Sequence, residues 1–250
     1  MGTSRNSAVR SIDPERNSLK RSFPTVFVAV LIVLVVAMAA SAAAPEDRVL
    51  PPSQYLSPKA KELATRHAKS LYELSADVYH CLPWLDVRKD SIGFFKPKNA
   101  ATDDRYLSMR VFIDQRSSPE FDQQSLEQQA SAMFSRYVGP LLKRMTRNPA
   151  ILADDAIYGF NVILEWTKQA PESPRARPVN ETIAAFMDKA DAIDYLSGKS
   201  GAHELAEKAR VLAWDGEREI GRIQLSAWDD NFVATYKVQN YQVKPGVTCP

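Results

Sequence analysis

The feature that most constrains this chain is an apolar segment, residues 23–44, which begins at Phe23 and ends at Ala44. Every residue from 26 to 40 is apolar, and Lys20 and Arg21 stand just before the segment. A positive flank, an apolar core and small residues at its end are typical of a secretory signal. Because the positive flank stays in the cytoplasm, we expect the chain after Ala44 to be translocated.

Two interpretations of residues 1–44 remain open, a cleaved signal peptide and an uncleaved signal anchor. Ala42 and Ala44 form an A-x-A cleavage pattern directly before Pro45. With its Ala-rich tail, however, the apolar run reaches about 20 residues, enough to cross a bilayer core of about 30 Å as a transmembrane helix. The protein is therefore expected in the periplasm or outside the cell, either soluble after cleavage near Ala44 or held in the membrane by one N-terminal span.

Composition limits the classes of protein that the rest of the chain can form. Removing residues 1–44 leaves about 200 residues, enough for one domain with a sizeable core. The chain is 45% hydrophobic and 25% charged, which excludes a largely disordered protein. Its net charge is +2, and part of that charge precedes the apolar segment. The exported part is thus close to neutral, which argues against a nucleic-acid binder.

The chain has two cysteines, Cys81 and Cys249, and both follow the export segment. In an oxidising compartment they can pair. A disulfide between them would close most of the domain and contribute roughly 4–5 kcal/mol on the chain-entropy model. The alternative is two unpaired thiols, with Cys81 buried and Cys249 frayed with the tail.

The pattern of apolar residues predicts two long helices. After a linker, residues 45–56, Ser57 and Pro58 give an N-cap and a first-turn proline for a helix that ends before Pro83. Ser118 and Pro119 repeat this signal and open a second helix that reaches about residue 147. Proline removes a backbone donor and clashes with the preceding turn, so Gly139-Pro140 is expected to kink or break this helix.

Period-two alternation predicts most of the strands. Residues 106–113, 157–166, 210–214, 219–227 and 232–241 read as strands. Residues 180–186 fit either a strand or a helix, and a strand that gives way to a short helix near residues 188–197 is favoured. Asp215-Gly216 is a tight-turn signal between two of them. We therefore expect residues 57–250 to form a single α+β domain, with a mostly antiparallel sheet and the two long helices packed on one face.

No sequence motif identifies a catalytic, metal or cofactor site. His203-Glu204 begins like a zinc-protease helix, but Glu207 stands where the second histidine must be. Serine-hydrolase elbows, phosphate-binding loops and C-x-x-C pairs are absent from the sequence. His67 lies on an apolar helical stripe and is interpreted as a packed core residue. Asp188, Asp191 and Asp194 are interpreted as a solvated acidic face.

A basic group at the end of the second predicted helix has two interpretations. Lys143, Arg144 and Arg147 complement the negative end of the helix dipole. Alternatively they contact an anionic surface, such as lipid or wall polymer. Of the two, complementing the helix dipole is the preferred interpretation, and the anionic contact is the functional alternative.

Three functional hypotheses follow. The first is a non-enzymatic binding or accessory module of the cell envelope, whose partner is an unknown protein or envelope ligand, with residues 23–44 in the membrane if they are not cleaved. The second is an exported hydrolase that uses carboxylates without a linear motif, which a pocket holding two carboxylates with pKa values pushed apart would support. The third is a structural partner that docks through exposed tryptophans, and the candidates are Trp84, Trp166, Trp214 and Trp228.

The intact mass of the protein recovered from its native host tests the export segment and the cysteines together. A chain that starts near Pro45 is expected for a cleaved signal peptide, and a full-length chain for an anchor. If Cys81 and Cys249 pair, alkylation adds to the mass only after reduction. Thiols that react without reduction would contradict the disulfide.

Overall fold

The computed structural model describes residues 45–98, 100–113, 116–117, 119–169, 178–226, 233–234 and 245–249. Ala42–Pro250 forms one compact unit. The predicted export segment, residues 23–44, lies outside the described residues. Among the helices in the described ranges, none combines the length and hydropathy needed to cross a membrane.

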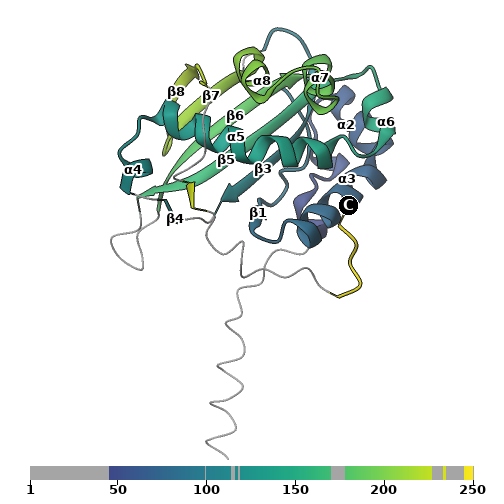
Figure 1. Ribbon diagram of the computed structural model, residues 1–250. Helices are drawn as coiled ribbons and strands as arrows, with labels where there is room; N and C mark the ends of the chain where they lie inside the picture. The colour runs from purple at the N-terminus through teal and green to yellow at the C-terminus, as the bar shows by residue number, and fades with distance from the viewer. Residues whose placement is uncertain are drawn as a thin grey trace, which may run out of the picture. The chain divides into compact units, whose positions relative to one another are not determined.

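A seven-stranded sheet organises the domain (Figure 1). Its order is β1-β3-β5-β6-β7-β8, with β2 paired to β3. All neighbours are antiparallel except β3 and β5, which are parallel. The mostly antiparallel α+β fold predicted from the sequence is therefore present. The strands are β1 (Leu85–Val87), β2 (Gly93–Phe95), β3 (Arg105–Ile113), β5 (Ile157–Gln169), β6 (Val179–Asp188), β7 (Arg210–Asp215) and β8 (Arg218–Ile223).

The parallel pair requires a long crossover between β3 and β5. Parallel neighbours cannot be joined by a hairpin, so the chain must travel the length of the sheet and return. It does so through three helices, and the longest of them, α5, runs across one face of the sheet (Figure 1). They are α4 (Pro119–Asp122), α5 (Leu126–Met145) and α6 (Pro149–Ala153).

The first predicted long helix is divided in two. It consists of α2 (Pro58–Arg66) and α3 (Ala68–Cys81), and His67 between them leaves the helical conformation with φ −102° and ψ 15°. As expected, the Ser57 side chain caps α2 by accepting a hydrogen bond from the Ala60 N–H. The prediction of two long helices is therefore not confirmed. The division follows from tertiary contacts of His67 that no local pattern records.

The second predicted helix begins later than expected and is not broken at Pro140. A capping box between Ser125 and Gln128 starts α5, after the separate short helix α4. The prediction of a break at Gly139-Pro140 is wrong, because α5 continues through both residues. Proline costs an interior helix about 3 kcal/mol. Here the residues on either side, Val138 and Leu141, are fully buried, and this packing holds the helix together.

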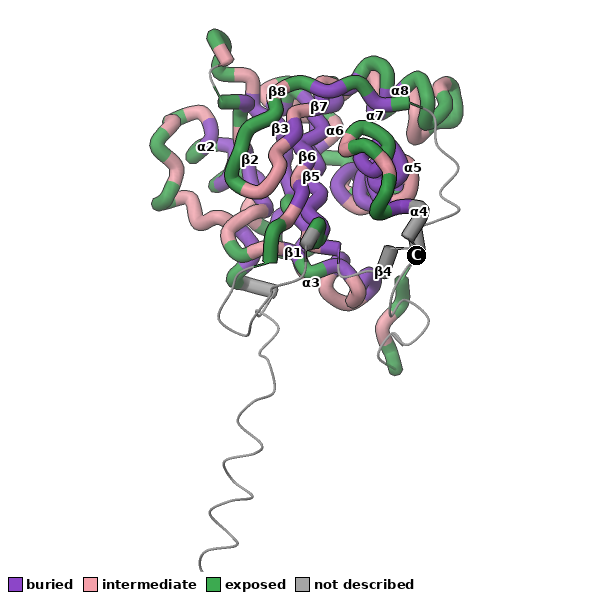
Figure 2. The backbone as a smooth tube through the Cα atoms, turned by 90° about the vertical axis from the view of Figure 1, so that its left-hand side faces the viewer, coloured by how far each residue is buried: buried purple, intermediate pink, exposed green. Residues whose placement is uncertain are grey.

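Alternation along the strands divides the sheet into two faces. On β3, Leu107, Met109 and Val111 are buried against the helices, as their spacing predicts. The helices α5, α7 and α8 lie on this side of the strands (Figure 2). The bounds of the last two are Lys189–Leu196 for α7 and Ala202–Lys208 for α8.

The opposite face of the sheet carries a smaller apolar cluster and an ion-pair network. Tyr106 and Phe186 are buried there, 5.2 Å apart between ring centroids. Glu165 accepts hydrogen bonds from Arg88 at 3.2 Å and from Arg110 at 3.1 Å. Burial alone would raise the pKa of Glu165, but hydrogen bonds from Arg88 and Asn180 and the charge of Arg110 outweigh burial and hold this pKa below its ordinary value. The network explains how this face keeps a buried carboxylate.

Residues 45–56, which the sequence assigns to a linker, make specific contacts with the domain. They contain the 3-10 helices η2 (Pro45–Arg48) and η3 (Pro52–Gln54). The Arg48 guanidinium lies 4.9 Å from the centre of the Tyr79 ring on α3, and Val49 forms a bridge with Ile92. Both Arg48 and Val49 are only 3% exposed.

The end of the chain departs from the predicted meander. Of the expected last strand, residues 232–241, the structure describes β9 (Val233–Ala234), which pairs with β4 (Arg116–Ser117) in a separate two-stranded sheet. It therefore does not extend the main sheet. In the structure a disulfide joins Cys249 to Cys81 at the end of α3, across 168 residues of sequence.

A substitution at Gly159 tests how closely the backbones of β5 and β6 approach each other at this position. A Cβ atom at this position would lie 2.1 Å from the carbonyl oxygen of Met187 on the neighbouring strand. We expect Gly159→Ala to lower the free energy of unfolding by about 1–3 kcal/mol, because a backbone neighbour must move. Denaturant unfolding followed by circular dichroism measures the loss.

Gly201→Ala is the matched control. A Cβ atom there has nothing within 4 Å, and the residue caps α8 without a positive φ. The change should cost less than about 1 kcal/mol, the ordinary penalty for alanine at an N-cap. Equal losses at the two positions would rule out the steric account of Gly159.

Candidate functional site

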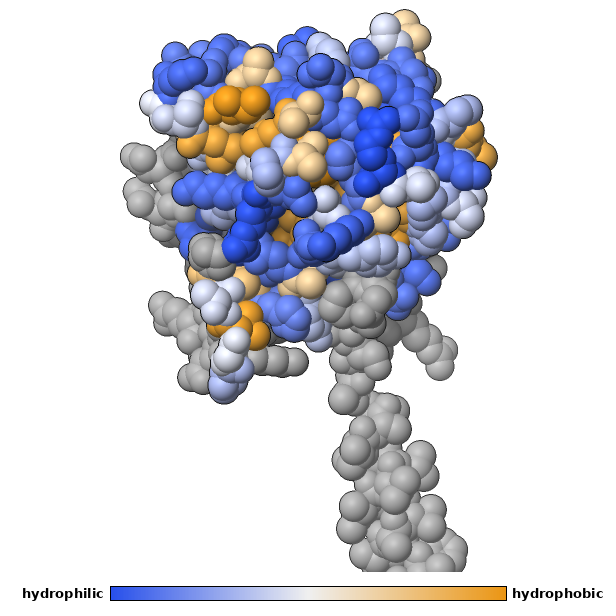
Figure 3. Space-filling model, turned by 90° about the vertical axis from the view of Figure 1, so that its right-hand side faces the viewer, coloured by the Kyte–Doolittle hydropathy of each residue, from blue (hydrophilic) through white to orange (hydrophobic). Residues whose placement is uncertain are grey.

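One cavity formed by described residues lies between α3, the end of α5 and α6. We call it the Arg144 cavity, and its volume is about 370 Å³. The face of the molecule that bears α3 and α6 shows apolar surface in hollows between hydrophilic side chains (Figure 3). The cavity is lined by Ser70, Leu71, Glu73, Leu74, Asp77, Leu107, Arg144, Met145, Arg147, Asn148, Pro149 and Ile151.

The wall of the Arg144 cavity has an apolar part and a polar part. Leu71, Leu107, Met145 and Ile151 are buried core residues that line it. On the polar side, Asn148 caps α6 by accepting from the Ala150 N–H at 3.0 Å and donates to Ser70 Oγ at 2.8 Å. An apolar wall with a few placed polar groups is typical of a small-molecule site.

Two of the three predicted anion contacts lie at this cavity. Arg144 Nη1 donates to both carboxylate oxygens of Asp77 at 2.9 Å, and Arg147 Nη1 donates to Asp77 Oδ1 at 3.0 Å. The Arg147 side chain is 49% exposed and that of Arg144 is 14% exposed. Lys143, which precedes Arg144 on α5, is exposed and does not line the cavity. The anionic contact itself stays a prediction.

The second cavity lies where the N-terminal end of α5 meets the ends of β5, β6 and β7. We call it the Glu181 cavity, and its volume is about 320 Å³. It is lined by Phe121, Asp122, Gln124, Leu126, Glu127, Gln129, Trp166, Thr167, Lys168, Glu181, Asp215, Arg218 and Ile220.

A hydrogen-bonded network connects the polar groups of the Glu181 cavity. The indole N–H of Trp166 is shared between Glu181 Oε2 at 3.0 Å and Gln129 Oε1 at 3.3 Å. Lys168 Nζ donates to Asp215 Oδ1 at 2.8 Å and lies 3.5 Å from Glu181 Oε1. The register explains this arrangement, because Glu181 pairs with Trp166 on one side and with Asp215 on the other.

The two carboxylates of this network have pKa values displaced in opposite directions. Burial raises the pKa of Glu181, and the charge of Lys168 and the Trp166 hydrogen bond offset this only in part. The hydrogen bond from Lys168 is the main cause that lowers the pKa of Asp215. Sequence reasoning missed Lys168, Glu181 and Asp215. The sequence does contain a signal for these residues, because a charged residue at a core-facing position of a predicted strand indicates a candidate site.

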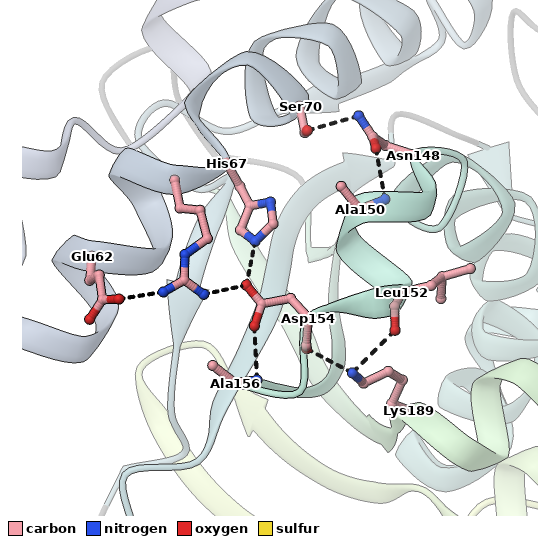
Figure 4. A network of polar contacts seen from close by, with 10 residues as sticks. Glu62, His67, Ser70, Asn148, Ala150, Leu152, Asp154, Ala156 and Lys189 are labelled. Atoms are coloured by element: carbon pink, nitrogen blue, oxygen red, sulfur yellow. Dashed lines mark hydrogen bonds and ion pairs between the residues drawn. The ribbon is translucent and has the colours of Figure 1, made fainter.

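A third polar cluster surrounds His67 (Figure 4). His67 Nε2 lies 2.7 Å from Asp154 Oδ2, and Arg66 Nη1 donates to the same oxygen at 2.7 Å. His67 is 5% exposed, which agrees with its interpretation as a packed core residue. Ser70, one turn along α3, accepts a hydrogen bond from Asn148, and no hydrogen bond joins it to His67 in the described part of the chain, so the serine–histidine contact of a nucleophilic triad is not seen here. The cluster joins the α2–α3 junction to the loop before β5.

The remaining candidate residues form local contacts. His203 and Glu207 face each other on α8 at 3.3 Å, and Asp191 and Asp194 pair with Lys208 and Lys199. Within the described ranges, no group of three His, Cys, Asp or Glu side chains could hold a metal ion. Trp166 is buried, Trp84 and Trp214 are half-buried, and Trp228 lies outside the described residues.

Comparison of the chain with protein-family models, with curated proteins and with solved structures found no match. The functional argument therefore rests on the geometry of the two cavities.

Asp154 provides a test of the His67 cluster through the pH dependence of stability. Burial would raise its pKa, but hydrogen bonds from His67, the Ala156 N–H and Arg66 lower it to about 2. A depressed pKa means that the ionised carboxylate stabilises the fold above its unfolded pKa of about 4, and that this contribution is lost as the pH falls through 2. We expect Asp154→Asn to cost on the order of 1 kcal/mol at pH 6, after solvent screening, and much less at pH 2.

Denaturant unfolding at the two pH values measures this difference. Asp155→Asn, at the exposed neighbouring position, is the control and should leave the pH dependence unchanged. A loss for Asp154→Asn that is the same at both pH values would show that the carboxylate charge is not what stabilises the cluster.

Proposed function

We propose that this protein is an exported or membrane-tethered binding module of the cell envelope that takes up an anionic amphiphile in the Arg144 cavity. Export is supported by the apolar segment that begins at Phe23 and ends at Ala44 and by its positive flank. A disulfide between Cys81 and Cys249 suits an oxidising compartment, the periplasm or the cell exterior. If residues 23–44 are retained, they hold the module at the membrane.

The observation that carries this proposal is a cavity with an apolar interior and two arginines in its wall. Its volume of about 370 Å³ falls within the ~300–1,000 Å³ range of small-molecule sites. Leu71, Leu107 and Ile151 provide surface for a hydrocarbon chain. Guanidinium groups recognise carboxylate, sulfate and phosphate groups through paired N–H donors.

The charges around the cavity favour an anionic head group. Asp77 is shared by Arg144 and Arg147, so the three side chains carry a net positive charge. Glu73, the other acid in the wall, lies 3.7 Å from Lys69 and is offset by it. A guanidinium has five N–H donors, and the contacts with Asp77 use one nitrogen of each arginine. The remaining donors suit a ligand oxyanion.

An exported hydrolase is the second candidate, and the Glu181 cavity is the observation that favours it. Glu181 and Asp215 line the same cavity and have pKa values displaced in opposite directions, as an acid and a base require. Lys168, however, binds Asp215 and lies 3.5 Å from Glu181. An ammonium between the two carboxylates occupies the place where a scissile bond and water would sit, so we rank binding above hydrolysis.

Octanoate is a suitable probe of the Arg144 cavity. The full chain is incorporated into phosphatidylcholine nanodiscs, and its thermal midpoint is measured with increasing octanoate or octyltrimethylammonium. Because a ligand that binds the native state stabilises it, we expect octanoate to raise the midpoint and the cation with the same tail to leave it unchanged. Arg147→Gln should need about ten times more octanoate for the same shift, since one charge-assisted contact is lost.

Lys61→Gln is the matched control, because Lys61 is exposed on α2 and does not line the cavity. It should respond to octanoate like the wild type. An equal response to both amphiphiles, or an unchanged response of Arg147→Gln, would contradict the proposed ligand class.

A further inference from the structure

We infer that the Glu181 cavity is a second binding site, and that its ligand is a neutral carbohydrate. The two sets of lining residues share no member, and opposite ends of α5 contribute to them. The inference therefore does not depend on the amphiphile proposed for the Arg144 cavity.

The polar groups of the cavity stand as adjacent donors and acceptors. Lys168 Nζ, a donor, lies 2.8 Å from Asp215 Oδ1, an acceptor, and 3.5 Å from Glu181 Oε1. Each hydroxyl of a sugar both donates and accepts. Two neighbouring hydroxyls of one ring can therefore bond to the ammonium and to a carboxylate at the same time, and leave the ion pair in place.

The charges around Lys168 disfavour small charged ligands at this position. The cavity is lined by four acidic residues and by two basic ones, Lys168 and Arg218. Its wall therefore carries a net negative charge, which repels an anionic ligand. At the Glu181–Asp215 pair, a cation would have to replace Lys168, which already neutralises Asp215 and lies 3.5 Å from Glu181. A neutral polyhydroxylated ligand is not repelled by the acidic wall and does not have to displace Lys168.

Apolar side chains beside the polar network complete the site. Phe121 and Leu126 line the cavity, and so does Ile220, which is 39% exposed. An exposed isoleucine beside polar groups suits the C–H face of a sugar ring. The polar groups are held on strands, and the indole N–H of Trp166 fixes the orientation of the Glu181 carboxylate by donating a hydrogen bond to it. The site is thus formed before any ligand arrives.

Titration calorimetry with neutral trisaccharides tests the inference. The full chain is held in polyoxyethylene-ether micelles, which carry no sugar, and is titrated with maltotriose, cellotriose and chitotriose. We expect at least one of them to bind, and Lys168→Met and Asp215→Asn to weaken that binding about ten-fold or more, since each removes a charge-assisted hydrogen bond. Release of reducing ends during the titration would support the site and add hydrolysis to it.

Lys199→Met is the matched control, because Lys199 also pairs with an aspartate, Asp194 at 3.4 Å, on a helix that does not contribute to the cavity. It should bind like the wild type. Thermal midpoints of all variants separate lost binding from lost folding, and the Lys168 side chain is 46% exposed. Failure of all three sugars to bind, unchanged binding in both cavity variants, or tighter binding of tetramethylammonium that Asp215→Asn removes would each overturn the inference.

Discussion

Parallel pairing of β3 with β5 forces the chain to cross the whole sheet before it returns, and the crossover lays α5 along the buried face. A helix of 20 residues spans about 30 Å, so its two ends meet different parts of the sheet. At its first turns Leu126, Glu127 and Gln129 line the Glu181 cavity, and at its last turn Arg144 and Met145 line the Arg144 cavity. Both candidate sites are thus consequences of one connection.

The helix α3, which forms the other wall of the Arg144 cavity, is fixed at both ends. Just before its start, His67 contacts Asp154 in the loop that leads to β5. At its end, Cys81 is joined to Cys249. In its middle, Asp77 binds Arg144 and so connects α3 to α5. These three contacts fix the position of α3 against α5 and so define this wall of the cavity.

Buried carboxylates divide into two kinds in this domain. Glu165 and Asp154 each accept several hydrogen bonds from cationic or N–H donors, and their pKa values are lowered. Glu181 accepts fewer, and burial raises its pKa. The first kind is well explained by structural stabilisation. Glu181 lies in a cavity wall, which is why it is the stronger candidate for ligand contact.

The sequence determined most of the local structure. Alternation identified β3 and β5, Asp215-Gly216 marked the turn between β7 and β8, and Ser57-Pro58 marked the start of α2. These features depend on neighbours in the chain, so a local pattern records them. The apolar segment that ends at Ala44 gives an expectation of export by the same kind of signal.

Only the tertiary structure decided how distant residues meet. The division of the first helix at His67 depends on Asp154, the continuity of α5 through Pro140 depends on core packing, and the parallel β3–β5 pair depends on strand order. Of the predicted site residues, the sequence supplied Arg144 and Arg147 but not Asp77, which holds them. Lys168, Glu181 and Asp215 come from three different strands, and only their register brings them to one cavity. Register and strand order are set by the burial of the whole sheet, and that information is not local in the sequence.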